Sequence, residues 1–412
     1  MPVQSISTAT RWWILIVSLL ATLCAFTFIN GVAFVIPMLE SKRDTNLAQA
    51  GLLASMPSAG MVLTLFGWGY LLDRIGERIV LSFGMALTGG ACFAAASMHS
   101  LPYVGVFLFL GGMAAACANT ASGRLVAGWF PAHQRGLVMG IRQTAQPLGI
   151  ALGAMVIPRF AQHGLEPALK FPAMICTVAA VACALGVLDP PRPPRTEAPA
   201  EYLANPYRGS SILWRLHVTS ATMMVPQCVI ATFMLVWLIR EQHLSIGTAG
   251  AMVTLAQLLG AAFRVAAGRW SDRVGSRLRP IRTLAAAGSA AMLILALTAH
   301  LGSPAATTAM ITAAVITVLD NGLASTAIAE VAGPFWSGRA LGAQNTSQRL
   351  TAAAAPPLFG ALTGAVGYPL AFAACAGVAL LAFPLVPVSQ EARQQESPES
   401  RSAVSGPTEA EQ

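Results

Sequence analysis

The stretch GYLLDRIGER, which runs from Gly69 to Arg78, decides the fold because it occurs twice. Its counterpart is GRWSDRVGSR, from Gly268 to Arg277, 199 residues further on. A second pair, GIRQTAQ at 140–146 and GAQNTSQ at 342–348, is separated by 202 residues. Two unrelated repeats at nearly one offset indicate an internal duplication, in which each copy supplies one half of the chain.

The segments around these repeats are long and apolar. Of the 412 residues, 55% are hydrophobic and 10% are charged, whereas soluble domains are about one quarter charged. Since a helix needs about 20 apolar residues to cross a bilayer, we expect an all-α membrane protein with twelve transmembrane helices in two pseudo-symmetric halves of six. The predicted spans are 13–38, 48–71, 79–98, 103–129, 136–158, 168–188, 212–239, 246–270, 282–301, 304–328, 339–365 and 368–387.

The spans divide the chain into four parts. Residues 1–188 form the N-terminal six-helix half, and residues 212–388 form the C-terminal half. Between them, residues 189–211 are rich in proline and charge, which predicts a polar linker. The polar segment 389–412 shows no periodicity and is predicted to be a disordered tail.

The basic residues predict how the protein is oriented. Loops on the side of the two termini carry 17 Lys and Arg residues, and loops on the opposite side carry five, Lys42, Arg43, Arg159, Lys170 and Arg240. Positive loops stay in the cytoplasm, so both termini are expected there, with composition favouring a bacterial inner (cell) membrane. This distribution also argues that the formal net charge of +8 does not serve to bind nucleic acid.

The repeated element G-x-x-x-D-R-x-G-x-R resembles the signature loop of the major facilitator superfamily, and the span count, duplication and linker extend the resemblance over nearly the whole chain. The resemblance implies a monomeric secondary transporter that works by alternating access. It also implies that Asp73 and Asp272 pair with arginines and helix ends across the two halves, with Arg74, Arg78 and Arg273 in the same gating loops. Enforcing topology is an alternative role for these arginines.

Two further signatures of drug–proton antiporters in the superfamily are altered in this chain. Leu108 stands where the fourth-span signature has an arginine, four residues before Gly112. The fifth-span signature requires Gly-Pro followed by paired glycines, and this chain has Gln146-Pro147-Leu148-Gly149. Both departures weigh against multidrug efflux.

Charges inside spans are costly and are functional candidates. Four residues qualify, namely Arg142, Arg264, Asp320 and Arg349, and their net positive charge favours an anionic ligand. Arg264 is similar to the eighth-span arginine of nitrate, monocarboxylate and oxalate transporters in the superfamily, where it is implied to grip the anion. Its planar guanidinium suits a carboxylate; pairing with an acid on a neighbouring helix is the alternative.

The other three interior charges have two possible roles each. Arg349, ten residues into the eleventh span, is similar to the second cation of oxalate-type exchangers, with pairing to Asp320 as the alternative. Arg142 is expected to be a gate or an interhelix tether rather than a ligand contact. Asp320 is the one acid well inside a span, so it is the candidate for proton coupling, or else a permanent partner of Arg349 or Arg264.

Uncharged polar residues complete the predicted site. Gln257 lies two turns from Arg264 on the same helix face. Asn30, Gln146 and Gln348 are further candidates to line a substrate cavity, with interhelical hydrogen bonding as the alternative.

Two functions therefore compete. The first is a secondary active transporter that moves a small organic anion, preferably a carboxylate, in a proton- or counter-anion-coupled cycle. The second is proton-coupled efflux of drugs or lipophilic cations, with Asp320 attracting the cation. The sequence shows no phosphate loop, metal-ligand spacing or nucleophile elbow, so we expect no enzyme activity, cofactor or metal.

Overall fold

Helices make up nearly all of the structure, a computed structural model that describes residues 6–36, 38–39, 47–191, 196, 198, 200–208 and 210–391. In the first half the helices are α1 (Thr8–Gly31, continued by the short helix η1, Val32–Val35), α3 (Leu47–Ile75), α4 (Glu77–Ser97), α5 (Leu101–Trp129), α6 (Ala132–Arg142), α7 (Ala145–Ala161) and α8 (Leu165–Gly186). In the second half they are α10 (Ile212–Arg240), α11 (Ile246–Val274), α12 (Leu278–His300), α13 (Ala305–Ile316), α14 (Asp320–Ala332) and α15 (Ser337–Leu385).

These helices provide the twelve expected spans. By length and apolar composition, ten helical segments of the described chain could each cross a membrane. The last of these is two helices joined at Gly367, whose φ of 80° interrupts the helical geometry, and the pair α6–α7 supplies one more. The fold class predicted from sequence is therefore confirmed.

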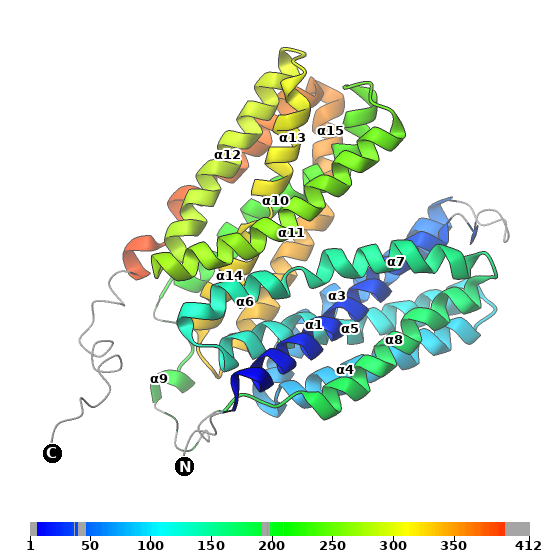
Figure 1. The fold of residues 1–412 in the computed structure, drawn as a ribbon, viewed down its shortest axis with the longest axis vertical. Coiled ribbons are helices and arrows are strands. Elements are labelled where there is room, and N and C mark those ends of the chain that lie inside the picture. The colour runs from blue at the N-terminus through cyan, green and yellow to red at the C-terminus, as the bar shows by residue number, and fades with distance from the viewer. Residues whose placement is uncertain are drawn as a thin grey trace.

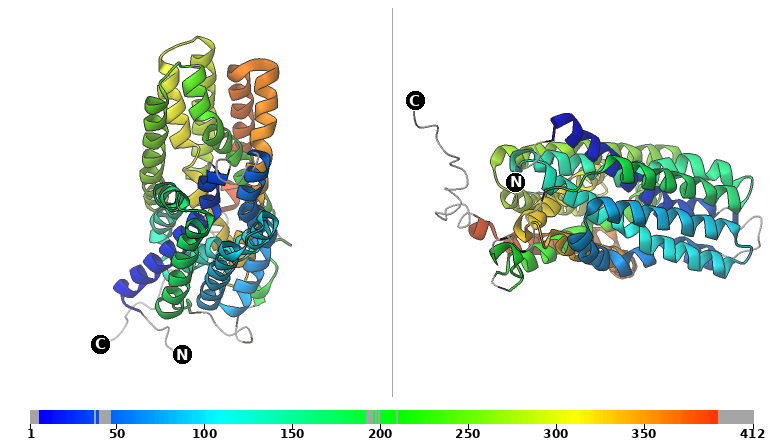
Figure 2. Two further views of the ribbon diagram at one scale, coloured as in Figure 1. Left: turned by 90° about the vertical axis from the view of Figure 1, so that its right-hand side faces the viewer. Right: turned by 90° about the horizontal axis from the view of Figure 1, so that it is seen from below.

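The two halves are separate bundles that meet at one end. Each has its own hydrophobic core: one cluster in the first half, from Ile14 to Val187, and two in the second half. Figure 1 shows the bundles in contact around α6, α11 and α14, while their far ends lie apart. The turned views of Figure 2 show the same two bundles at an angle. We call the contacting end, which carries the repeated loops, the motif end.

The described part of the linker contacts the motif end. Its short helix α9 (Ala200–Leu203) and Tyr207 lie beside the start of α15, where the Trp336 indole donates a hydrogen bond to the Leu203 carbonyl at 3.2 Å. Arg192, Arg195, Lys42, Arg43, Arg393 and Arg401, used to predict orientation, lie outside the described residues.

The chain is helical again just after the last predicted span. Residues 388–391 are helical, and Glu391 accepts hydrogen bonds from the Ser276 hydroxyl and the Arg277 amide, at 2.5 and 2.9 Å. Asp189 caps α4 in the corresponding way, through the amides of Glu77 and Arg78. Glu391 thereby joins the end of the described chain to the start of α12. Residues 392–412 lie outside the described range, so the disordered tail stays a prediction.

Two spans are broken in mid-course. Span five stops at Arg142 and resumes at Ala145. In a continuous helix the Gln143 carbonyl would accept a hydrogen bond from the amide of residue 147, but residue 147 is a proline and has no N–H. Span ten stops at Ile316 and resumes at Asp320. At this break the Thr317 hydroxyl donates a hydrogen bond to the Ala313 carbonyl, one turn earlier. Each break exposes backbone carbonyls inside the bundle.

Candidate functional site: two latches and a carbonyl-bound arginine

The first latch joins the end of α3 to the start of α15. The Asp73 carboxylate accepts hydrogen bonds from the amides of Gly338 and Arg339, at 3.0 and 3.1 Å. The Arg339 side chain binds the same carboxylate at 2.9 Å, and Arg124 lies 3.2 Å from it on the other side. Arg124 also donates to the Pro334 carbonyl at 2.6 Å. A carboxylate at a helix N-terminus is held by free amides and by the helix dipole, so this contact ties the halves together.

The second latch repeats the pair of amide contacts with the halves exchanged, but its arginine comes from the same half as its acid. Asp272, at the end of α11, accepts hydrogen bonds from the amides of Gly136 and Leu137 in α6, at 2.9 and 2.8 Å. Arg277 binds the same carboxylate at 2.6 Å. Gly136 and Leu137 precede Gly338 and Arg339 by 202 residues, so the two latches are pseudo-symmetric equivalents.

A further ion-pair group reinforces the second latch. Glu330 of α14 lies 3.3 Å from Arg135 of α6 and 3.2 Å from Arg277. Arg277 also donates to the Ala132 carbonyl in the first half. The burial of Arg277 lowers its pKa, but the neighbouring carboxylates of Glu330 and Asp272 outweigh this, so the pKa lies above its ordinary value.

The predicted gating residues therefore separate into two groups. Asp73 and Asp272 lie in the latches, whereas Arg74 and Arg273 are exposed and make no hydrogen bond or ion pair to the other half within the described residues. Arg78 contacts its own half, donating to the Ala184 carbonyl at 2.7 Å. A gating role for these three arginines stays a prediction.

Arg264 lies where both broken spans meet. Its Nε donates to the carbonyl of Val318 in the break of span ten, at 3.2 Å. One terminal nitrogen lies 3.4 Å from the carbonyl of Gln143, in the break of span five of the other half. Helix carboxyl ends carry partial negative charge, so these carbonyls hold the guanidinium. Its pseudo-symmetric counterpart is the buried Leu65, so the charge is specific to the second half.

Asp320 begins the half-helix that follows the break in span ten. It is 2% exposed and lies in the first turn of α14, where a carboxylate is stabilised by the helix N-terminus. Asp320 interacts electrostatically with Arg264. Nevertheless, among the described residues no ion pair within 4.0 Å joins it to Arg264 or Arg349.

Arg349 contacts the first half rather than Asp320. Its guanidinium carbon lies 5.5 Å from the centroid of the Phe26 ring in α1. The Arg349–Asp320 pair considered from sequence is therefore not formed, because the arginine reaches across to an aromatic face, a favourable cation–π position. Arg349 remains half-buried.

Arg142 is a tether within the first half. It is 4% exposed and donates to the Ser122 hydroxyl at 2.9 Å, to the Asn119 side-chain oxygen at 2.8 Å and to the Asn119 carbonyl. These bonds join α6 to α5 beside the break in span five. The structure thus contains the interhelix tether expected as one alternative, and gating by Arg142 stays a prediction.

The uncharged candidates lie in different environments. Gln348 donates to the Asn321 side chain at 3.3 Å, and Asn321 donates to Gln227 at 3.1 Å, so three amides from three helices form one network. Asn30 donates to the Phe26 carbonyl of its own helix at 3.0 Å. Gln146 is half-buried, and Gln257 is exposed.

Sequence reasoning missed several residues of this site. Arg124, Arg339, Arg277 and Glu330 are not among the site residues that the sequence predicts. The 202-residue repeat could have identified the amide pair that faces each acid, because it aligns Gly136 with Gly338. Nothing in the sequence pattern indicated that Arg264 would lie at the breaks of two different spans.

Together, the duplicated bundles, the mirrored latches and the interior arginine between them define a membrane transporter of two six-helix halves. The family model of the Major Facilitator Superfamily matches residues 18–356, and the chain belongs to this family. It is 62% identical, over 378 residues, to the uncharacterized MFS-type transporter Rv2994 of Mycobacterium tuberculosis, a match that covers 92% of this chain and 85% of that protein.

More distant similarities agree with this assignment. The 4-hydroxybenzoate transporter PcaK of Acinetobacter baylyi is 29% identical over 164 residues, covering 38% of this chain and 35% of that protein. The crystal structure of the human organic anion transporter MFSD10 superposes with a TM-score of 0.70 at 18% identity, over 91% of this chain and 99% of that one. The similarity to MFSD10 is a similarity of fold.

Proposed function

We propose that this transporter moves a small organic anion, a carboxylate, and that Arg264 contacts it. The observation that carries the proposal is the position of Arg264: it is half-buried, lies at the junction of the halves, and is held by two carbonyls instead of an acid. Asp320 lies within electrostatic range of Arg264 but forms no ion pair with it. Within the described chain, the donors of the guanidinium are bound only to neutral carbonyls, so an anion that approaches gains a charge-assisted contact.

Two further observations support an anion. Three of the four interior charges are positive, and Arg349 presents a second half-buried guanidinium where the two halves face each other. In addition, the partial relative PcaK is named for an aromatic carboxylate. Efflux of cations receives less support, because Asp320 is almost fully buried at a helix N-terminus.

The proposal extends to the orientation of the protein in the membrane and to the coupling of its transport cycle. With the termini in the cytoplasm, the motif end faces the cytoplasm, and the conformation described here is closed on that side by the two latches. Asp320 would couple transport to protons; without such coupling, the cycle would exchange one anion for another. We place the protein in a bacterial inner membrane on the basis of its basic loops.

Thermal unfolding of the purified full chain tests the anion site. The probes are 4-hydroxybenzoate, a series of aliphatic carboxylates and a series of lipophilic cations, each measured with the wild type, Arg264→Gln and Arg240→Gln. Arg240 is an exposed arginine in the last turn of α10, and its variant serves as the control. We expect a carboxylate to stabilise the wild type and the control, with an affinity about tenfold lower in Arg264→Gln, because a charge-assisted contact contributes about 1.5–3 kcal/mol.

The opposite result would have a distinct pattern. Stabilisation by lipophilic cations that persists in Arg264→Gln, with no response to any carboxylate, would replace the anion proposal with cation efflux. Equal carboxylate affinity in the wild type and Arg264→Gln would remove Arg264 from the site.

A further inference from the structure

The last arginine of the repeated motif has different surroundings in the two halves. Arg277 is 8% exposed and is bound in the second latch. Its equivalent, Arg78, is exposed on the outer face of the first half, where its Nε donates to the Ala184 carbonyl at 2.7 Å. Within the described residues, the terminal nitrogens of Arg78 have no hydrogen-bond partner. The latch therefore does not account for this arginine.

Arg78 lies at the mouth of an apolar groove between α4 and α8. The groove has a volume of about 480 Å³, and Ile79, Ser82, Phe83 and Ala86 of α4 face Ala180, Val181 and Ala184 of α8 across it. Alanines on both helices leave the space open. From Arg78 to Ala86 the groove descends about 12 Å along α4, at about 1.5 Å per residue. It thus leads from the end of the helix into the hydrocarbon region.

The mouth of the groove is at the level of the membrane interface. Trp13 of α1 is 57% exposed and lies against Gly186 at the end of α8, two residues after the Ala184 carbonyl. Exposed tryptophans are enriched at the level of the lipid headgroups. Arg78 is therefore positioned to meet a headgroup while the groove below it meets an acyl chain.

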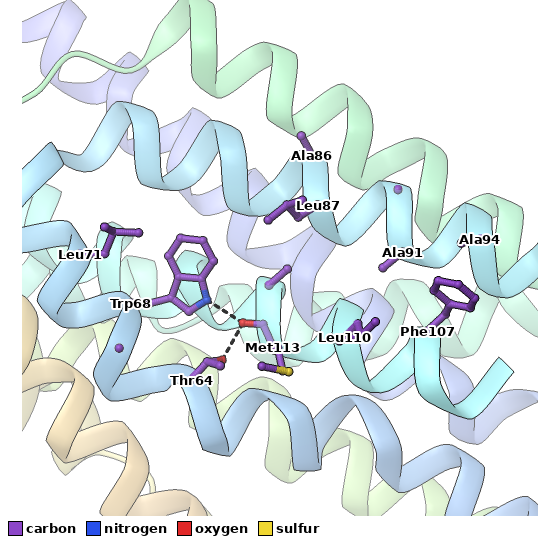
Figure 3. A pocket seen from close by; sticks show the side chains of 13 residues that line it. Thr64, Trp68, Leu71, Ala86, Leu87, Ala91, Ala94, Phe107, Leu110 and Met113 are labelled. Atoms are coloured by element: carbon purple, nitrogen blue, oxygen red, sulfur yellow. Dashed lines mark hydrogen bonds between the residues drawn. The ribbon is translucent and has the colours of Figure 1, made fainter. Parts of the chain in front are cut away.

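A second pocket lies on the other flank of α4. It measures about 650 Å³, is lined by α3, α4 and α5, and shares Ala86 with the groove. It exists because α3 and α4 both pack against α5 and scarcely against each other. Figure 3 shows the polar groups of Thr64 and Trp68 directed at the Met113 carbonyl, to which they donate at 2.7 and 2.6 Å. The pocket therefore presents an apolar surface.

We propose that these features form a binding site for one anionic phospholipid. The phosphate contacts the Arg78 guanidinium, one acyl chain lies in the α4–α8 groove, and the other crosses α4 at Ala86 into the second pocket. Charge complementarity selects the occupant. The mouth carries the Arg78 guanidinium, whose terminal nitrogens are free to bind a phosphate, while the neighbouring Asp189 carboxylate is bound by the amides of Glu77 and Arg78. The walls are apolar, so the site matches an anionic headgroup on hydrocarbon chains. In the second half the equivalent arginine, Arg277, is bound in the latch, so its guanidinium is not available to a headgroup.

Native mass spectrometry of the delipidated full chain in detergent tests this site. The probes are dioleoyl phosphatidylglycerol and dioleoyl phosphatidylcholine, which differ in headgroup charge. An arginine near an anionic headgroup contributes about 1 kcal/mol, so the wild type should bind the first phosphatidylglycerol about fivefold more tightly than the first phosphatidylcholine. Arg78→Ala should abolish this preference, and Arg78→Lys should keep most of it.

Two other variants separate the headgroup contact from the chain contact. Ala86→Phe places a large side chain at the residue that the groove and the second pocket share, so it should weaken the binding of both lipids equally. Arg279→Ala removes an exposed arginine near the start of α12 and should change neither. Equal binding of the two lipids by the wild type, or a preference that survives in Arg78→Ala, would overturn the proposal. A loss of preference in Arg279→Ala as large as in Arg78→Ala would do so too.

Discussion

Asp73 and Arg339 are 266 residues apart in sequence, yet the Asp73 carboxylate binds both the backbone amide and the side chain of Arg339, at 3.1 and 2.9 Å. The same carboxylate caps the first turn of α15, so one side chain fixes the position of a helix in the opposite half. Asp272 likewise binds α6 of the first half, through the amides of Gly136 and Leu137 in its second turn. The closed motif end thus depends on two carboxylates that each bind backbone amides of a helix in the other half.

We expect Asp73→Asn to weaken closure at the motif end. The substitution replaces charge-assisted hydrogen bonds, worth about 1.5–3 kcal/mol, with a neutral amide, which shifts the equilibrium between closed and open states by about tenfold or more. Hydrogen–deuterium exchange of the amides at 337–341 should accelerate accordingly. Asp189→Asn, which removes a cap within the first half, is the control; equal acceleration at 337–341 in both variants would contradict the latch.

Close helix contact at the motif end depends on Gly268. A Cβ at this position would overlap the carbonyl of Gly136 in the other half. We therefore expect Gly268→Ala to destabilise the closed state by about 1–3 kcal/mol, the usual cost of overpacking, and to reduce transport. Gly250→Ala in the same helix has open space around its new methyl group and should leave transport unchanged. Similar transport by the two variants would argue against helix contact at Gly268 as a step of the cycle.

Asp320→Asn tests the coupling role. If Asp320 carries the coupled proton, proteoliposomes containing the variant should take up substrate at the rate seen without a pH gradient while still exchanging internal for external substrate. The physical reason is that an amide cannot bind and release a proton in the relevant range. Uptake that still responds to the gradient would assign Asp320 a structural role at the start of α14.

Arg349 is expected to be a second anion contact. Arg349→Gln should lower carboxylate affinity by about tenfold. Phe26→Leu removes the ring beneath the guanidinium but keeps the charge, so it should lower affinity less, in line with the about 0.5–2 kcal/mol of a cation–π contact. Thermal-shift titrations measure the carboxylate affinity of both variants. An equal loss of affinity in the two would mean that Arg349 serves mainly to hold Phe26 of the other half.

Part of the site could be predicted because it depends on local sequence. Burying a charge in a span is costly, so Arg142, Arg264, Asp320 and Arg349 could be identified as unusual from the sequence alone. Their partners could not, because each partner comes from another helix. The prediction considered Arg349 with Asp320, whereas the structure places Arg349 over Phe26 and Arg264 on the carbonyls of Val318 and Gln143.

The sequence by itself determined that the chain spans a membrane, that it is duplicated, and where its spans fall. These properties follow from hydropathy and repetition along one dimension, because lipid demands about 20 apolar helical residues wherever the chain crosses. Only the tertiary structure decided that Arg277 is bound in a latch while its equivalent Arg78 faces outward, and that Arg264 meets two broken helices. Those contacts depend on how two bundles cross, and the crossing is fixed by packing between residues some 200 positions apart, which no local pattern records.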